Sequence, residues 1–209
     1  MEKKLRVVSW WDTALQYLEK EEPQFRSVIK EAAGDGLLEG RDLFRSMLRA
    51  VCGQQVNNTA AMRMQSSVLA AAKATGERSL VLGVLKLSED ALRECGLTVT
   101  KARAIAGLAR GYAEGRFTRK AFSKQTDSEV KAALQTVKGV GPWTADMILI
   151  FGLNRPDVFA AGDFGVRESF RTIFTNPDTM LQKAESWRPY RTAATWLLWR
   201  SRSKTPVRY

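Results

Sequence analysis

A glycine turn followed by a lone carboxylate is the part of this sequence best suited to chemistry. Gly139 and Gly141 flank Val140 in a tight turn, and Asp163 follows it downstream. Glycines carry no side chains, so backbone N–H groups and the start of the next helix can point at one spot. Such a spot suits a phosphate group. Asp163 stands about twenty residues after the turn, between Gly162 and Phe164, and is our candidate for the acid or base.

The sequence around the turn predicts a helix on each side of it. Thr126 and Glu129 have the spacing of a capping box, which predicts a helix over 127–136. Pro142 suits the first turn of a second helix, since its missing N–H would have no partner there. Apolar or small residues continue this second helix at helical spacing: Ala145, Ile148, Leu149 and Gly152. The stretch 127–152 is therefore helix, glycine hairpin, helix, although an ordinary pair of helices joined by a glycine turn fits the spacing too.

Composition narrows the chemistry that remains. The chain has 209 residues and a formal net charge of +11, which favours nucleic acid as a partner, although a merely soluble basic protein is the alternative. It contains no histidine, so histidine bases and ligands are excluded. Cys52 and Cys95 form no metal-binding pair, and both are expected to be small core residues. Carboxylates and lysines are left to do any chemistry.

Hydropathy predicts a soluble protein. No apolar run is long enough to cross a membrane, and the first residues lack the apolar core of a secretory signal. We therefore expect a cytoplasmic protein that works with the chromosome.

Helical periodicity dominates the chain and predicts an all-α fold with a single domain over 1–209. Asp12 and Ser88 are expected to cap helices, Pro23 to open one, and a last helix to span 189–202. The run 5–8 is a strand or an extended arm. Residues 117–125 form a basic connector, either a phosphate contact or a solvated loop, and the tail 203–209 is expected to be frayed.

The motif as a whole resembles a known family. The string Gly139-Val140-Gly141-Pro142-Trp143-Thr144-Ala145, followed by Asp163, is similar to the helix-hairpin-helix–Gly/Pro–Asp superfamily of DNA glycosylases. Trp143, and the string Trp187-Arg188-Pro189-Tyr190-Arg191 with Trp199, resemble its 3-methyladenine DNA glycosylase II branch, which repairs alkylation damage. The resemblance covers roughly residues 40–200 and implies two helical lobes flanking a cleft.

The resemblance also implies roles in catalysis. Asp163 would stabilise positive charge on the sugar and orient water, whereas the alternative is that it only caps the helix 164–174. Trp143 and Trp199 would stack on the extruded base. Met147 occupies a position where many relatives have tyrosine, which leaves the shape of the base pocket and the substrate range open.

Contacts with DNA are implied at two places. The hairpin residues Lys138, Gly139, Val140, Gly141 and Thr144 would hold a DNA phosphate, and family members can bind a monovalent cation on hairpin carbonyls. No other cofactor and no protein-bound metal is expected. Gln55 matches the residue that wedges into the base stack, although a polar loop between helices is the alternative for 53–57.

These expectations define a monofunctional DNA glycosylase that excises alkylated bases such as 3-methyladenine in base excision repair. In bifunctional relatives a lysine lies two residues after the second glycine, where this chain has Trp143. A glycosylase for uracil, mismatched thymine or oxidised purine, and a non-catalytic DNA-binding protein, are the alternatives. The expected partner is damaged double-stranded DNA, and the expected state is a monomer.

Overall fold

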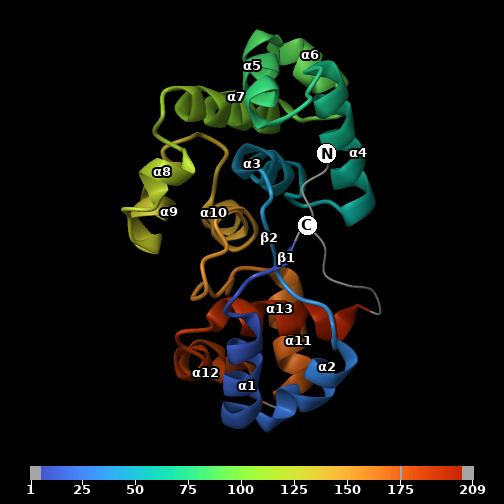
Figure 1. Ribbon diagram of the computed structural model, residues 1–209. Helices are drawn as coiled ribbons and strands as arrows, with labels where there is room; N and C mark the ends of the chain where they lie inside the picture. The colour runs from blue at the N-terminus through green and yellow to red at the C-terminus, as the bar shows by residue number, and fades with distance from the viewer. Residues whose placement is uncertain (1–5, 175, 204–209) are drawn as a thin grey trace. The chain divides into compact units, whose positions relative to one another are not determined.

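The structure is a computed structural model that describes residues 6–174 and 176–203 (Figure 1). The chain divides into two compact units. The first joins the two ends of the sequence, Met1–Gly40 and Asn154–Tyr209, and the second is the central stretch Arg41–Leu153. Helices dominate both units, so the predicted all-α class is confirmed. One unit is thus built from both terminal segments of the sequence, and we call it the terminal unit and the other the central unit.

The central unit is built around helix α3, Leu43–Cys52. Every residue of α3 except Arg45 is buried, which is the pattern of a helix surrounded by others. Figure 1 shows α3 close to α7 and α10, and it also contacts α4 and α5. The other helices of this unit are α4 (Asn58–Ala71), α5 (Glu77–Lys86), α6 (Glu89–Glu94), α7 (Val99–Ala113), α8 (Arg119–Phe122), α9 (Asp127–Gln135) and α10 (Pro142–Met147), which continues into the π-helical turn η2 (Ile148–Gly152).

Side-chain caps fix where many of these helices begin. The Ser88 hydroxyl accepts the Ala91 N–H, and the Thr126 hydroxyl accepts the Glu129 N–H, so both predicted caps are confirmed. A first-turn N–H has no partner within its own helix, and each cap supplies one. Thr98 caps α7 in the same way, because its hydroxyl accepts the Lys101 N–H. The predicted basic connector contains the short helix α8, which the sequence did not reveal.

The terminal unit contains α1 (Trp11–Glu21), the 3₁₀ turn η1 (Pro23–Phe25), α2 (Arg26–Glu31), α11 (Phe164–Ile173), the 3₁₀ turn η3 (Pro177–Thr179), α12 (Met180–Ser186) and α13 (Arg191–Arg202). Helix α13 packs against α11, α1 and α2 (Figure 1). The core of the terminal unit is aromatic. In it, Trp187 contacts the rings of Phe25, Phe159, Phe170 and Phe174. A short antiparallel pair joins β1 (Arg6–Val7) to β2 (Leu38–Glu39), which confirms a strand near the start.

Three predicted helix starts are wrong in this unit. Helix α1 begins at Trp11, which is buried in the core, and Asp12 lies in the first turn instead of capping it. Pro23 opens a 3₁₀ turn, and α2 proper begins only at Arg26. Helix α13 begins at Arg191 and not at Pro189, because the Asp157 carboxylate accepts the Arg191 N–H and its guanidinium. The predicted frayed tail lies, from residue 204 on, outside the described residues.

Candidate active site and DNA-binding hairpin

The glycine hairpin has the geometry that its sequence predicts. Gly139 has φ +94°, a left-handed conformation that favours glycine. A Cβ atom there would lie 3.1 Å from both the Cγ2 and the carbonyl oxygen of Thr100, so α7 can approach only a bare backbone. The Val140 N–H donates to the Val137 carbonyl at 2.9 Å and closes the turn. Pro142 is the first residue of α10, as predicted.

The outer side of the hairpin is open. Nothing lies within 4 Å of where a Cβ atom of Gly141 would be, and the Lys138 side chain is exposed. Val140, in contrast, is buried and anchors the turn. The hairpin therefore offers bare backbone and one lysine to solvent, which is compatible with the predicted phosphate contact.

An ion pair joins the two helices of the motif. Lys131 on α9 pairs with the Asp146 carboxylate on α10, which is buried. Burial raises the pKa of Asp146, and the nearby Lys131 ammonium opposes that shift only in part. Farther along, a Cβ atom at Gly152 would lie 2.9 Å from the Leu43 side chain, so η2 packs closely on α3. These contacts hold the second helix against its neighbours.

The predicted base-contacting residues of α10 differ in exposure. Trp143 is half-buried, whereas Met147 is only 1 % exposed. Thr144 is buried as well, and its hydroxyl accepts a hydrogen bond from the Gln54 side-chain amide at 2.8 Å. The Thr144 side chain thus stabilises the fold of the hairpin, and its predicted role in DNA binding would fall to its backbone.

Gln55 lies at the exposed tip of the loop 53–57, which joins α3 to α4. Its φ is +52°, which is uncommon for a residue other than glycine, asparagine or aspartate. The neighbouring Val56 is 41 % exposed. Asn57 ends the loop by capping α4, because its side chain accepts the Ala60 N–H. An exposed, conformationally restricted tip fits the predicted wedge, whose role stays a prediction.

Asp163 is held by two hydrogen bonds to the same carboxylate oxygen. Its Oδ1 accepts the Val166 N–H at 2.9 Å, so Asp163 does cap α11. The same Oδ1 accepts the indole N–H of Trp199, from α13, at 2.8 Å. The hydrogen bonds fix the side-chain rotamer, and Asp163 remains partly exposed. Capping and a chemical role are therefore compatible at this residue.

The structure brings the predicted residues together in two groups. Asp163 and Trp199 belong to the terminal unit, and the hairpin, Trp143, Met147 and Gln55 belong to the central unit. Sequence reasoning missed the bond between Asp163 and Trp199, and it missed Gln54 and a structural use for Lys101. The predicted cleft between the lobes stays a prediction.

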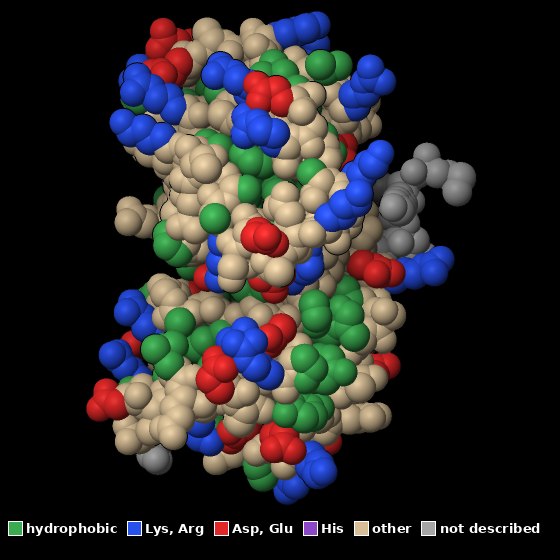
Figure 2. All heavy atoms as spheres, turned by 90° about the vertical axis from the view of Figure 1, so that its left-hand side faces the viewer, with side chains coloured by type: hydrophobic (Ala, Val, Ile, Leu, Met, Phe, Trp, Pro, Cys, Tyr) green, Lys and Arg blue, Asp and Glu red, His purple; other side chains and the backbone are tan. Residues whose placement is uncertain are grey.

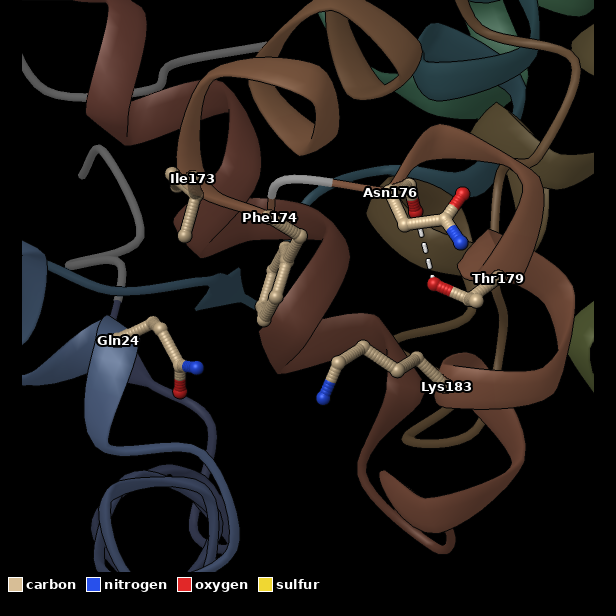
Figure 3. A pocket seen from close by; sticks show the side chains of 6 residues that line it. All are labelled: Gln24, Ile173, Phe174, Asn176, Thr179 and Lys183. Atoms are coloured by element: carbon tan, nitrogen blue, oxygen red, sulfur yellow. Dashed lines mark hydrogen bonds between the residues drawn. The ribbon is translucent and has the colours of Figure 1, made fainter.

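A shallow pocket in the terminal unit is unrelated to Asp163. It has a volume of about 160 Å³ and is lined by Gln24, Ile173, Phe174, Asn176, Thr179 and Lys183 (Figure 3). Its single cation, Lys183, pairs with the buried Glu22 carboxylate at 2.7 Å. Thr179 donates its hydroxyl to the Asn176 carbonyl at 2.8 Å. Lys183 and Thr179 are thus engaged with Glu22 and with the Asn176 carbonyl, respectively.

Metal-binding clusters and accessible thiols are two other sources of chemistry in proteins. Within residues 6–174 and 176–203, no cluster of three or more histidine, cysteine, aspartate or glutamate side chains could hold a metal. At the hairpin, the Val137 and Gly139 carbonyls already accept hydrogen bonds, so a monovalent cation would need their second lone pairs or other carbonyls. Both cysteines are buried as predicted, and burial raises the pKa of Cys52 to about 12.

The positive charge is dispersed on the face that Figure 2 displays. Lys and Arg side chains alternate there with Asp and Glu side chains. Several arginines are engaged with acidic neighbours, including Arg93 with Asp90 and Arg103 with Glu89. The net charge of +11 provides a general electrostatic attraction to DNA. No helix in the described part of the chain is long and apolar enough to cross a bilayer.

Comparison with known proteins decides the family. The model of the HhH-GPD superfamily of base excision DNA repair proteins matches residues 48–191. The chain belongs to this superfamily. The match includes the hairpin and Asp163, so the family predicted from the motif is confirmed.

Several proteins similar to this chain are named DNA-3-methyladenine glycosylases, which belong to the alkylation-repair branch of the superfamily. DNA-3-methyladenine glycosylase 1 of Schizosaccharomyces pombe is 28% identical over 170 residues, which cover 78% of this chain and 74% of the relative. The putative DNA-3-methyladenine glycosylase YfjP of Bacillus subtilis is 25% identical over 215 residues, which cover 96% of this chain and 74% of that relative. The S. pombe 3-methyladenine DNA glycosylase in complex with abasic DNA has the same fold, with a TM-score of 0.79 and 23% identity over 90% of this chain and 96% of that chain.

Proposed function

We propose that the chain is a monofunctional DNA glycosylase that excises alkylated bases such as 3-methyladenine during base excision repair. The observation that carries the proposal is Asp163, a carboxylate fixed by the Val166 N–H and the Trp199 indole. A protein that only clamps DNA needs no oriented carboxylate at this position. The relatives named DNA-3-methyladenine glycosylases support the alkylated base as the substrate.

The reaction breaks the glycosidic C–N bond between the sugar and the damaged base. Positive charge develops on the sugar as this bond lengthens. The Asp163 carboxylate opposes that charge, and it can orient or deprotonate the attacking water. Its orientation matters because a fixed charge needs no rearrangement when the transition state forms. Val166 and Trp199 provide that fixed orientation.

Base recognition falls to aromatic side chains. The enzyme must turn the damaged nucleotide out of the duplex before it can reach the bond. Alkylation of a ring nitrogen can make the base cationic, and a cation is attracted to the face of a tryptophan ring. Trp143 and Trp199 are both partly exposed, and they are the aromatic side chains that this proposal assigns to the base. A cationic base is also a good leaving group, which suits a chain without histidine.

Water, and not an amine, is the nucleophile in this proposal. Trp143 occupies the position of the lysine that attacks the sugar in bifunctional relatives, and tryptophan cannot form an imine. Lys138 is exposed beside the hairpin, where it can meet a phosphate. The product is then free base and an intact strand with an abasic site. The hairpin and Gln55 hold the duplex, and a monomer suffices for all of these steps.

A lesion panel tests the proposed substrate. Purified protein is incubated with duplexes that contain methylated purines, uracil, mismatched thymine or 8-oxoguanine, and released bases are quantified by chromatography. We expect release of methylated base only, or at least at a much higher rate. Preferential release of uracil, thymine or 8-oxoguanine would move the protein to another substrate class. Binding without any base release would favour the non-catalytic alternative.

A further inference from the structure

Lys101 has a buried ammonium group whose two hydrogen bonds go to backbone carbonyls and not to a carboxylate. Its side chain is 7 % exposed, and its ammonium donates to the carbonyls of Cys52 and Gln54, each at 3.0 Å. Cys52 is the last residue of α3, where unpaired carbonyls carry partial negative charge. The ammonium thus bridges the end of α3 and the loop that carries Gln55.

This arrangement is costly for Lys101 itself. It lies in the first turn of α7, the end of a helix that disfavours a positive charge. Burial also lowers the pKa of its ammonium group. A surface lysine would avoid both costs. The two carbonyl contacts therefore identify the loop 53–57 as the structure that this lysine stabilises.

Gln54 extends the connection from the loop to the hairpin. Its side-chain amide donates to the Gly139 carbonyl at 2.9 Å and to the Thr144 hydroxyl at 2.8 Å. Gly139 in turn packs closely on Thr100, because a Cβ atom on Gly139 would lie 3.1 Å from the Thr100 carbonyl oxygen. The start of α7, the loop and the hairpin therefore meet at one junction, and all three belong to the central unit.

We propose that Lys101 and Gln54 are positioning residues that lock the Gln55 loop to the phosphate-binding hairpin. Gln55 follows directly after Gln54 and has a left-handed backbone that tertiary contacts must maintain. When the hairpin grips a phosphate, the lock sets where Gln55 enters the base stack. The inference rests on the proposed function, because it assumes that Gln55 holds open a duplex.

The test compares two kinds of variant. The first kind lacks the N–H donors but has a side chain of similar volume, and the second keeps the positive charge. Lys101→Met and Gln54→Met remove the hydrogen bonds at similar side-chain volume. Lys101→Arg retains a cation with N–H donors at the same place, and Gln55→Ala marks the loss of the wedge itself. The readout is independent of catalysis: 2-aminopurine next to a tetrahydrofuran abasic site, in a duplex, becomes fluorescent when its stacking is disturbed.

Wild-type protein should raise this fluorescence on binding, and both Met variants should lose most of the rise, as Gln55→Ala does. Lys101→Arg should keep most of it. In single-turnover excision the Met variants should lose about tenfold on duplex DNA, the effect of roughly one unsatisfied buried polar group, and much less on single strands.

A full fluorescence rise in both Met variants would overturn the proposal, and so would equal losses on duplex and single strands. If one Met variant does not fold, the other decides. Binding of wild-type protein without any rise would show that Gln55 is no wedge, which also overturns it. Fluorescence that behaves as expected in a protein without base release would instead contradict the proposed function and leave the lock standing.

Discussion

The two functional regions of this chain are held in place by different kinds of contact. In the terminal unit, Asp163 is fixed by a backbone N–H three residues away and by one indole. In the central unit, the hairpin and the loop 53–57 are fixed by side chains that donate to backbone carbonyls far away in the sequence. The proposed catalytic carboxylate thus depends on Val166 and on Trp199, of which the family resemblance names Trp199. The proposed DNA-binding hairpin and loop depend on Lys101 and Gln54, to which the resemblance assigned no such role.

The largest effect is expected in the terminal unit. Asp163→Asn keeps the size and the hydrogen-bond acceptor but removes the negative charge that opposes the sugar cation. Excision of methylated bases should fall by at least about 10²-fold, the typical cost of losing one electrostatic stabiliser of a transition state. Single-turnover base release measures this loss. Binding to an abasic-analogue duplex, measured by fluorescence anisotropy, should stay within a few-fold of wild type. A proportional loss of binding would make Asp163 a DNA contact and not a catalytic group.

The central unit should instead respond to a backbone change. Gly139→Ala places a Cβ atom at a φ of +94° and 3.1 Å from Thr100. We expect a loss of about 1–3 kcal/mol in the free energy of unfolding, typical of a residue forced into a sparse backbone region. Gly141→Ala is the matched control, because nothing lies within 4 Å of its Cβ position. Urea denaturation of both variants checks the difference, and similar stabilities would show that the close approach to α7 is not needed.

Trp199→Phe separates the ring from its hydrogen bond. Phenylalanine keeps an aromatic face for the base but cannot donate to Asp163 Oδ1. Because a hydrogen bond to a charged group contributes about 1.5–3 kcal/mol, we expect roughly a tenfold or larger drop in the excision rate. Affinity for the abasic-analogue duplex should hardly change. An unchanged excision rate would mean that the Val166 cap alone orients the carboxylate.

The smallest effect concerns the pH dependence of the Lys131–Asp146 pair. Burial raises the pKa of Asp146 above that of the unfolded chain, so the folded state binds its proton more tightly. Its contribution to stability is therefore full below the unfolded value of about 3.9 and falls as the pH rises through the folded value. Relative to Asp146→Asn, wild type should lose stability over that window. Urea denaturation of both proteins at a series of pH values tests this. If wild type instead gained stability relative to Asp146→Asn as the pH rises, the assigned direction would be wrong.

The sequence predicted the parts of the molecule whose causes are local. The capping box of Thr126 and Glu129, the glycine hairpin and the cap at Asp163 all depend on residues within four positions of one another. Short-range patterns of this kind can be read directly from the order of residues. The family motif added the expectation that Asp163 is chemical as well as structural.

Contacts between distant residues were not predictable in this way. Trp199 meets Asp163 across 36 residues, and Asp157 sets the start of α13 from 34 residues away. One signal was available for Lys101, since a lysine in the first turn of a helix opposes the helix dipole and invites a search for another partner. The family resemblance assigned a role to Gln55 alone, and nothing in the sequence showed that Gln54 contacts the hairpin, because that contact spans 85 residues and is visible only in the fold.

The products formed from a single labelled substrate test the central claim most directly. A duplex with one methylated purine is incubated with the protein in the presence and absence of borohydride, which traps an imine between enzyme and sugar. We expect free methylated base, an unbroken strand with an abasic site, and no trapped adduct, because water aided by Asp163 is the nucleophile. A covalent adduct that disappears in Lys138→Ala would contradict this and make the protein a lyase with an amine nucleophile.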